Sequence, residues 1–243
     1  TFHAAEEQQF GFDQKNYTQW MNQYPCIRLP DSSLYFVPYK AIGSNHSDVL
    51  IARIKSENTL IAPRFETKNG QVLVATQLND STYEIQTGEH LRGQMLYAFD
   101  DVGAKIGKVF LPIYASYVYD LQVVPVNGAN VPDSLQTVIN RTFSQANIQF
   151  NVSVTENYSF AFDANDNGLD VAADGHMTHY SEEMRALRDQ YFEDSTKTKR
   201  TYYLFVVPDI ADDLNGYMVR GKAVGFIENG APARVYAHEL GHG

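Results

Sequence analysis

Thr201-Tyr-Tyr-Leu-Phe-Val-Val-Pro208 is the stretch that decides the fold of this 243-residue chain. Its apolar residues follow one another without alternation, and most of them are β-branched or aromatic. Such a run is too short for a typical helix and is characteristic of a strand buried on both faces. We therefore expect residues 201–208 to form a central strand of a sheet that is covered on both sides.

Strands and helices are expected to alternate around this run. Apolar residues recur at intervals of three and four between the strands, which indicates amphipathic helices. Strands are expected at 117–126, 148–155 and 219–227, and helices beginning at Pro132, after a Ser181 cap, and at Pro232. This order predicts an α/β or α+β domain with a mixed sheet.

The first half of the chain has a different character. Short β-branched and aromatic runs recur there, separated by turn sequences such as Lys68-Asn69-Gly70. The runs lie at 34–39, 48–54, 60–65, 72–77, 82–86, 94–99 and 105–111. We expect an α+β fold in two domains, with an all-β sandwich or barrel at 1–115 and the mixed domain at 116–243.

Composition excludes several classes of protein. The 29 acidic and 19 basic residues give a formal charge of −10, and a surface this acidic repels phosphate backbones. No run of about 18 apolar residues occurs, so no membrane span is expected. The one cysteine, Cys26, excludes an internal disulfide. We expect neither nucleic-acid binding nor membrane insertion.

The pattern H-E-x-x-H occurs at residues 238–242 on the last expected helix. Residues four apart lie one turn apart on one helix face, so His238 and His242 can bind the same ion. Two imidazoles suit Zn²⁺, which takes a third protein ligand and keeps one position for water. Glu239 lies beside that face and can exchange a proton with the water. Two surface histidines on a helix are the alternative interpretation.

Ala237-His-Glu-Leu-Gly-His-Gly243 resembles the signature of the metzincin clan of zincin metallopeptidases. The resemblance implies that 116–243 form the upper half of a catalytic domain with a mixed, twisted sheet. It implies zinc ligation by His238 and His242 and a general base and acid role for Glu239. It also implies that residues 216–227 form an edge strand that binds extended peptide substrates.

The same resemblance implies that a third zinc ligand and a Met-turn follow Gly243, in a further C-terminal part of the catalytic domain. We therefore expect a secreted or cell-surface zinc endopeptidase, represented here by a fragment that is inactive by itself. The domain at 1–115 is expected to be a pro-domain or accessory domain. The alternative is a calcium-stabilised β-rich surface or adhesion module with a non-catalytic zincin-like scaffold.

The segment 163–174 fits a calcium-binding loop that resembles those of EF-hands and dockerins. Oxygen ligands are expected at the positions that such loops use, with Gly168 at the turn. The candidate calcium ligands are Asp163, Asn165, Asn167, Leu169 (through its carbonyl) and Asp174. An ordinary turn rich in Asn, Asp and Gly is the alternative, and both interpretations stay open.

Cys26 precedes Ile27-Arg28-Leu29-Pro30-Asp31, a segment similar to the propeptide of matrix metalloproteinases. In that family a cysteine thiolate occupies the open zinc position and keeps the enzyme latent. The resemblance makes Cys26 a candidate latency ligand. A cysteine packed in the interior at the start of a strand is the alternative interpretation.

Overall fold

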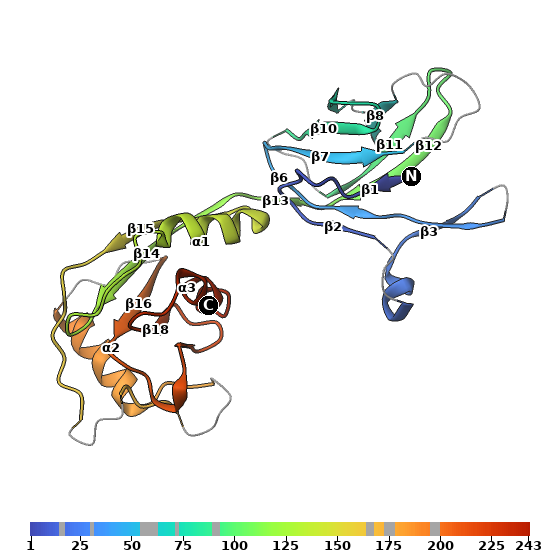
Figure 1. Ribbon diagram of the computed structural model, residues 1–243. Coiled ribbons are helices and arrows are strands. Elements are labelled where there is room, and N and C mark those ends of the chain that lie inside the picture. The colour runs from blue at the N-terminus through green and yellow to red at the C-terminus, as the bar shows by residue number, and fades with distance from the viewer. Residues whose placement is uncertain are drawn as a thin grey trace. The chain divides into compact units, whose positions relative to one another are not determined.

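The computed structural model describes residues 1–14, 18–29, 32–53, 63–70, 73–88, 93–163, 168–172, 178–194 and 200–243. The chain forms two compact units (Figure 1). The first unit comprises Thr1–Ser116 with Ser144–Asn147, and the second comprises Tyr117–Phe143 with Ile148–Gly243. The protein belongs to the α+β class, with more strand than helix and with mixed sheets.

Two sheets build most of the first unit. The four-stranded sheet has the order β1 (Phe2–His3), β7 (Ser47–Ala52), β10 (Thr82–Gln86), β9 (Val74–Gln77). The five-stranded sheet has the order β2 (Phe12–Asp13), β5 (Tyr39–Lys40), β12 (Lys105–Leu111), β11 (Gln94–Phe99), β8 (Arg64–Thr67). The smaller elements are the hairpin β3 (Cys26–Arg28) and β4 (Leu34–Phe36), the pair β6 (Ile42–Gly43) and β13 (Ile113–Tyr114), and η1 (Thr18–Gln23).

One hydrophobic core joins the two larger sheets. Every second residue of β7 and β10 is buried, for example Leu50 and Ile85, and these contact Leu96 and Val109 from the other sheet. The alternation follows from strand geometry, in which successive side chains point to opposite faces. The two sheets therefore share a single apolar interior.

A buried ion pair ties the beginning of the chain to these sheets. The Lys40 ammonium contacts the Asp48 carboxylate and also donates to the carbonyl of Phe10 at 2.8 Å. The carboxylate accepts the backbone N–H groups of Gln9, Phe10 and Val49, each at 2.8 Å. Both charged groups are thus fully partnered, as a buried ion pair requires.

The second unit is built on one five-stranded sheet. Its strand order is β15 (Ile148–Val154), β14 (Tyr117–Pro125), β16 (Thr201–Val207), β18 (Val224–Glu228), β17 (Gly216–Met218). The first four strands are parallel and β17 is antiparallel at the edge. The helices are α1 (Leu135–Phe143), α2 (Glu182–Asp194) and α3 (Ala233–Leu240), with short turns at η2 (Ser144–Ala146) and η3 (Ala211–Asp213).

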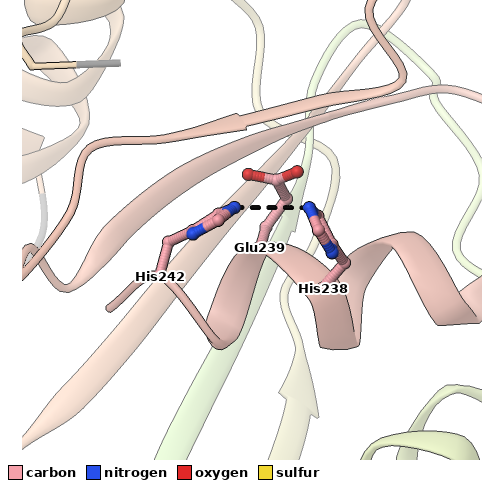
Figure 2. Close-up of side chains that lie close together, drawn as sticks. All are labelled: His238, Glu239 and His242. Atoms are coloured by element: carbon pink, nitrogen blue, oxygen red, sulfur yellow. Dashed lines mark hydrogen bonds between the residues drawn. The ribbon is translucent and has the colours of Figure 1, made fainter. Parts of the chain in front are cut away.

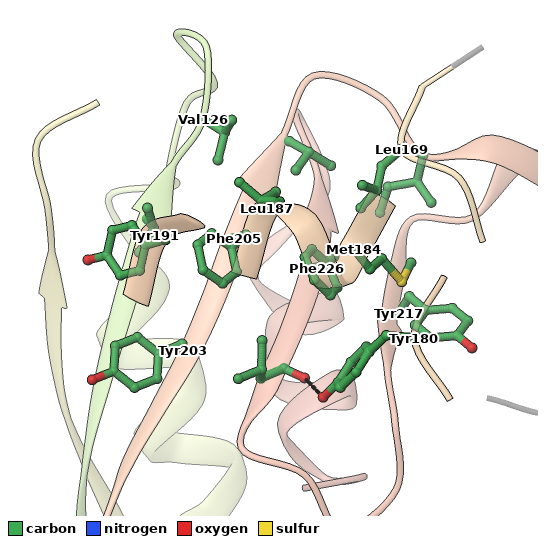
Figure 3. Close-up of a cluster of buried hydrophobic side chains, with 14 of the residues drawn as sticks. Val126, Leu169, Tyr180, Met184, Leu187, Tyr191, Tyr203, Phe205, Tyr217 and Phe226 are labelled. Carbon is green, nitrogen blue, oxygen red and sulfur yellow. Dashed lines mark hydrogen bonds between the residues drawn. The ribbon is translucent and has the colours of Figure 1, made fainter. Parts of the chain in front are cut away.

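The predicted central strand is confirmed, because β16 is the third of five strands and is buried on both faces. Tyr203 and Phe205 join α2 in one core (Figure 3), and Leu204 and Val206 join α1 and α3 in the other. Helices therefore cover both sides of the sheet. No helix in the described ranges is long and apolar enough to cross a membrane.

Two helix starts test the sequence signals for capping. The Ser181 hydroxyl accepts the N–H of Met184 at 3.0 Å, which confirms the predicted cap of α2. The helix expected from Pro132 begins later, at Leu135, because the Leu135 N–H bonds to the Pro132 carbonyl in a tight turn. Pro132 therefore begins the turn that leads into the helix.

Candidate metal centre

Helix α3 places the two histidines of the H-E-x-x-H pattern on one side of the second unit. Pro232 is the N-cap of the helix, which therefore begins at Ala233, one residue after the expected start. The helix ends at Leu240, but Gly241 keeps right-handed helical angles (φ −70°, ψ −14°). His242 follows this extra turn. The turn brings His242 back to the side of His238, as the spacing predicts.

The two imidazoles face each other edge to face (Figure 2). Their Nε2 atoms lie 3.3 Å apart, and the ring planes are inclined by 87°. This distance allows a hydrogen bond between the rings. It also equals the separation of about 3.3 Å that two nitrogens adopt on tetrahedral zinc with Zn–N bonds of about 2.05 Å. The separation of the two Nε2 atoms is therefore compatible with a shared zinc ion.

Glu239 completes the cluster from a buried position. Its side chain is 3% exposed, and its ligand atoms lie within 4.8 Å of those of His238 and His242. Oε2 is buried and has no hydrogen-bond partner among the described residues. Burial raises the pKa of Glu239 to about 7, and a hydrogen bond from the backbone of Met218 opposes this shift. A carboxylate this buried is stabilised by a nearby cation, which fits a metal at the two histidines.

The carboxylate of Glu239 rests against β17. A Cβ atom placed on Gly216 would lie 2.8 Å from Cγ of Glu239 and 3.0 Å from its Oε1, closer than real Cβ contacts. The sequence places Gly216 in the expected edge strand 216–227 but does not show which helix packs on it. In the structure only Gly216–Met218 of that range forms the edge strand, with Gly216 paired to Ile227 on the inner strand β18. Only a residue without a side chain leaves this space.

His242 is anchored from the neighbouring turn. Its carbonyl accepts the N–H of Gly221 at 2.8 Å, in the connection between β17 and β18. Burial lowers the pKa of His242, and His238 and Arg220 lower it further. The neutral imidazole, which is the form that binds metals, is favoured as a result.

The candidate calcium loop lies only partly within the described residues. Asn165, Asn167 and Asp174 fall outside them. Leu169 is buried, and its carbonyl accepts the N–H of Ala211 at 3.0 Å. The backbone N–H groups of Asp163 and Asp170 both donate to the carboxylate of Glu183, at 3.0 and 2.8 Å. These bonds close the described ends of the loop, and calcium binding there stays a prediction.

Cys26 lies on β3 of the first unit and is exposed. The alternative interpretation of an interior cysteine is therefore wrong, because the β3–β4 hairpin leaves this side chain at the surface. Its role as a latency ligand stays a prediction.

Comparison with known proteins adds little to this geometry. Neither protein-family models nor curated proteins match the chain. Among solved structures, the chain is similar to a sialyltransferase from Photobacterium damsela at 14% identity and a TM-score of 0.25. The match covers 69% of this chain and 35% of that one, so the chain spans about a third of the matched protein. A TM-score this low supports no inference about fold or activity.

Proposed function

We propose that the protein is a zinc-dependent endopeptidase, with His238 and His242 as zinc ligands and Glu239 as general base and acid. One observation carries the proposal. Two imidazole nitrogens at the spacing of tetrahedral zinc lie beside a buried carboxylate whose Oε2 has no partner in the described part of the chain. The oxygens of structural carboxylates in protein interiors normally all have partners, so a buried oxygen without one favours a functional role.

Each residue of the cluster has a distinct task in this proposal. A bound zinc ion supplies Lewis acidity to the scissile carbonyl and to a water molecule. Glu239 removes the proton from the attacking water and delivers it to the leaving amine, so the carboxyl returns to its starting state. Gly216 and the Met218 N–H hold the carboxylate in place.

The order of elements supports the resemblance to metzincins. Strand, helix, strand, strand, edge strand and site-bearing helix occur in the order that the resemblance implies, but with two additional elements: α2 before β16, and β18 between the edge strand β17 and α3. The edge strand β17 is antiparallel to β18 and contacts Glu239 through Gly216. In the proposed enzyme, an extended peptide adds to β17 as a further strand and so lies beside the carboxylate.

Zinc binding by the 243-residue chain is the first test. We expect binding that is lost in His238→Ala and in His242→Ala, measured by competition with a zinc-sensitive dye. His179→Ala is the matched control, because His179 is exposed and belongs to the same unit. Equal binding by all four proteins would contradict the assignment of the ligands. Calcium-dependent stability without zinc binding would favour the adhesion module.

Peptide hydrolysis is the second test, made in a polypeptide that continues beyond Gly243 and so includes the proposed third ligand. Glu239→Gln should lower kcat/KM on an unstructured peptide by about 10²–10⁴-fold, the usual range for a general base or acid. Glu193→Gln, an exposed change on α2, should leave the rate unaltered. Equal rates in the Glu239→Gln variant and the parent protein would exclude the mechanism.

A further inference from the structure

A cavity of about 360 Å³ lies in the first unit, between the β3–β4 hairpin and the first residues of β12. The proposed peptidase chemistry does not use it. Ile27, Leu29 and Ile106 line it, and Leu29 and Ile106 are 39% and 38% exposed. Its volume is within the range of about 300–1,000 Å³ that ligand pockets occupy. Exposed apolar side chains that line a hollow indicate a surface for another molecule.

Positive charge surrounds the same cavity. Arg28, Lys105 and Lys108 line it, although the chain as a whole carries a formal charge of −10. Among the described residues, no carboxylate lines the cavity or forms an ion pair with these three side chains. The Lys105 ammonium lies 4.0 Å from the centre of the Tyr97 ring, which holds it on this face. The cavity thus suits a ligand with negative groups.

The third feature is an open strand edge. On one side β12 pairs with β11, whereas β5 contacts its other side only where Phe110 pairs with Tyr39. In the described residues, no strand pairs with Lys105–Lys108 on that other side. The Tyr35 hydroxyl donates to the Lys108 carbonyl at 2.8 Å, so backbone groups of β12 face the hairpin there. An open edge of this kind is a template for an added strand.

We propose that this cavity binds an acidic peptide in extended conformation, with apolar residues at alternate positions. The peptide backbone pairs with β12 at Lys105–Gly107, because the Tyr35 hydroxyl already occupies the Lys108 carbonyl. The register of β12 shifts between Lys105 and Gly107, which brings Lys105 and Lys108 to the same side of the strand. The acidic side chains of the peptide face these lysines and Arg28, and its apolar side chains, which point to the opposite side, cover Ile27 and Ile106. The proposal is independent of the zinc site, because every residue it uses belongs to the first unit.

Binding is measured with a dye attached to Cys26, the chain's one cysteine, which is exposed next to Ile27. Calorimetry on unlabelled protein repeats the measurement. The probe is an acetylated and amidated peptide of four Glu-Leu repeats, which we expect to bind. Four Lys-Leu repeats, four Glu-Ser repeats, and the Glu-Leu peptide with alternate backbone amides methylated should each bind at least about tenfold more weakly. Dodecanoate is a further control, because it is an amphiphilic anion without a peptide backbone. It should bind more weakly than the Glu-Leu peptide if backbone pairing contributes to binding.

Two double variants separate local charge from net charge. Lys105→Glu with Lys108→Glu should weaken binding of the Glu-Leu peptide by about tenfold or more. Lys68→Glu with Arg234→Glu makes the same change in net charge at exposed sites elsewhere, and should alter binding by less than about twofold. If the first variant unfolds, Arg28→Gln with Lys105→Gln replaces it, because both side chains are exposed.

Four outcomes would overturn the proposal. The first is that the Glu-Leu peptide does not bind, and the second is that the Lys-Leu peptide binds as tightly as the Glu-Leu peptide. The third is that the methylated peptide or dodecanoate binds as tightly as the Glu-Leu peptide. The fourth is that the Lys68 and Arg234 control loses as much affinity as the Lys105 and Lys108 variant. Selective binding of the Glu-Leu peptide, lost only in the cavity variants, supports it.

Discussion

Asp48 in the first unit and Glu239 in the second are both buried carboxylates, but their surroundings differ. Asp48 accepts three backbone N–H groups and contacts the Lys40 ammonium. Glu239 has a backbone bond from Met218 at one oxygen, while Oε2 has no partner in the described chain. The first carboxylate is bonded to the unit that surrounds it, whereas the second keeps one buried oxygen that could bind another group.

The difference between the two carboxylates can be explained by the free-energy cost of burying a charge. Burying a charge costs free energy, and hydrogen bonds and an opposite charge offset that cost for Asp48. Among the described residues, no set of partners fully offsets the free-energy cost of burying Glu239. We therefore expect this carboxylate to lower the stability of the second unit. Proteins accept such local destabilisation at active sites, where the same group becomes useful in the reaction.

The largest expected effect on stability comes from removing the Asp48 carboxylate, which has all of its described partners in the first unit. Asp48→Ala leaves the Lys40 ammonium and the N–H groups of Gln9 and Phe10 without their partner. We expect the first unit to lose about 3–5 kcal/mol, the cost of breaking a buried pair. Hydrogen exchange in β7 and β10 measures this loss in the first unit alone. Asp80→Ala, at an exposed aspartate, is the control, and a loss below about 1 kcal/mol for Asp48→Ala would contradict the comparison.

The next effect disturbs the reactive carboxylate without removing it. Gly216→Ala places a methyl group against Glu239, and displacing a catalytic group by about 1 Å costs up to 10²-fold in rate. We expect kcat to fall by about one to two orders of magnitude while KM changes little. Gly88→Ala in the first unit is the control, since a Cβ atom there meets nothing within 4 Å. Equal kcat values in the two variants would show that Gly216 has no positioning role.

The smallest expected effect comes from replacing each buried carboxylate by the corresponding amide. This test compares the two sites directly, because the same chemical change is made in both. In chelator-treated protein, Glu239→Gln should leave the stability of the second unit unchanged or raise it by up to about 1 kcal/mol. Asp48→Asn should lower that of the first unit by about 2 kcal/mol, because it weakens charged hydrogen bonds. Urea unfolding followed by hydrogen exchange measures both. Similar losses in the two units would remove the distinction between the sites.

Local pattern was enough to predict much of the fold. The runs at 82–86, 94–99 and 105–111 coincide with β10, β11 and β12. These strands could be predicted because a strand with one buried face shows alternating burial along its sequence. Thr201–Val207 was identified as central by its continuous apolar character. The Ser181 cap and the approach of His238 to His242 follow equally from local spacing.

Contacts between distant segments could not be predicted in this way. In the sequence, Lys40 looks like a solvated side chain, but its ammonium donates to the Phe10 carbonyl. Gln9 and Phe10, more than 35 residues before Asp48, donate their N–H groups to the Asp48 carboxylate that pairs with it. The contact between Gly216 and Glu239 joins β17 to α3, and no local pattern predicts which helix packs on this strand. Strand order and the open edge of β12 have the same origin, because pairing depends on chain positions far apart in sequence.

The bond from the Gly221 N–H to the His242 carbonyl links the turn that follows the edge strand directly to a proposed metal ligand. In the proposed enzyme, a peptide that orders β17 also orders the turn that anchors His242. Peptide and zinc then bind with a shared coupling free energy, and thermodynamic linkage makes it reciprocal. If the peptide raises the affinity for zinc by some factor, zinc raises the affinity for the peptide by the same factor. The proposed enzyme would then bind its metal most tightly while substrate is bound.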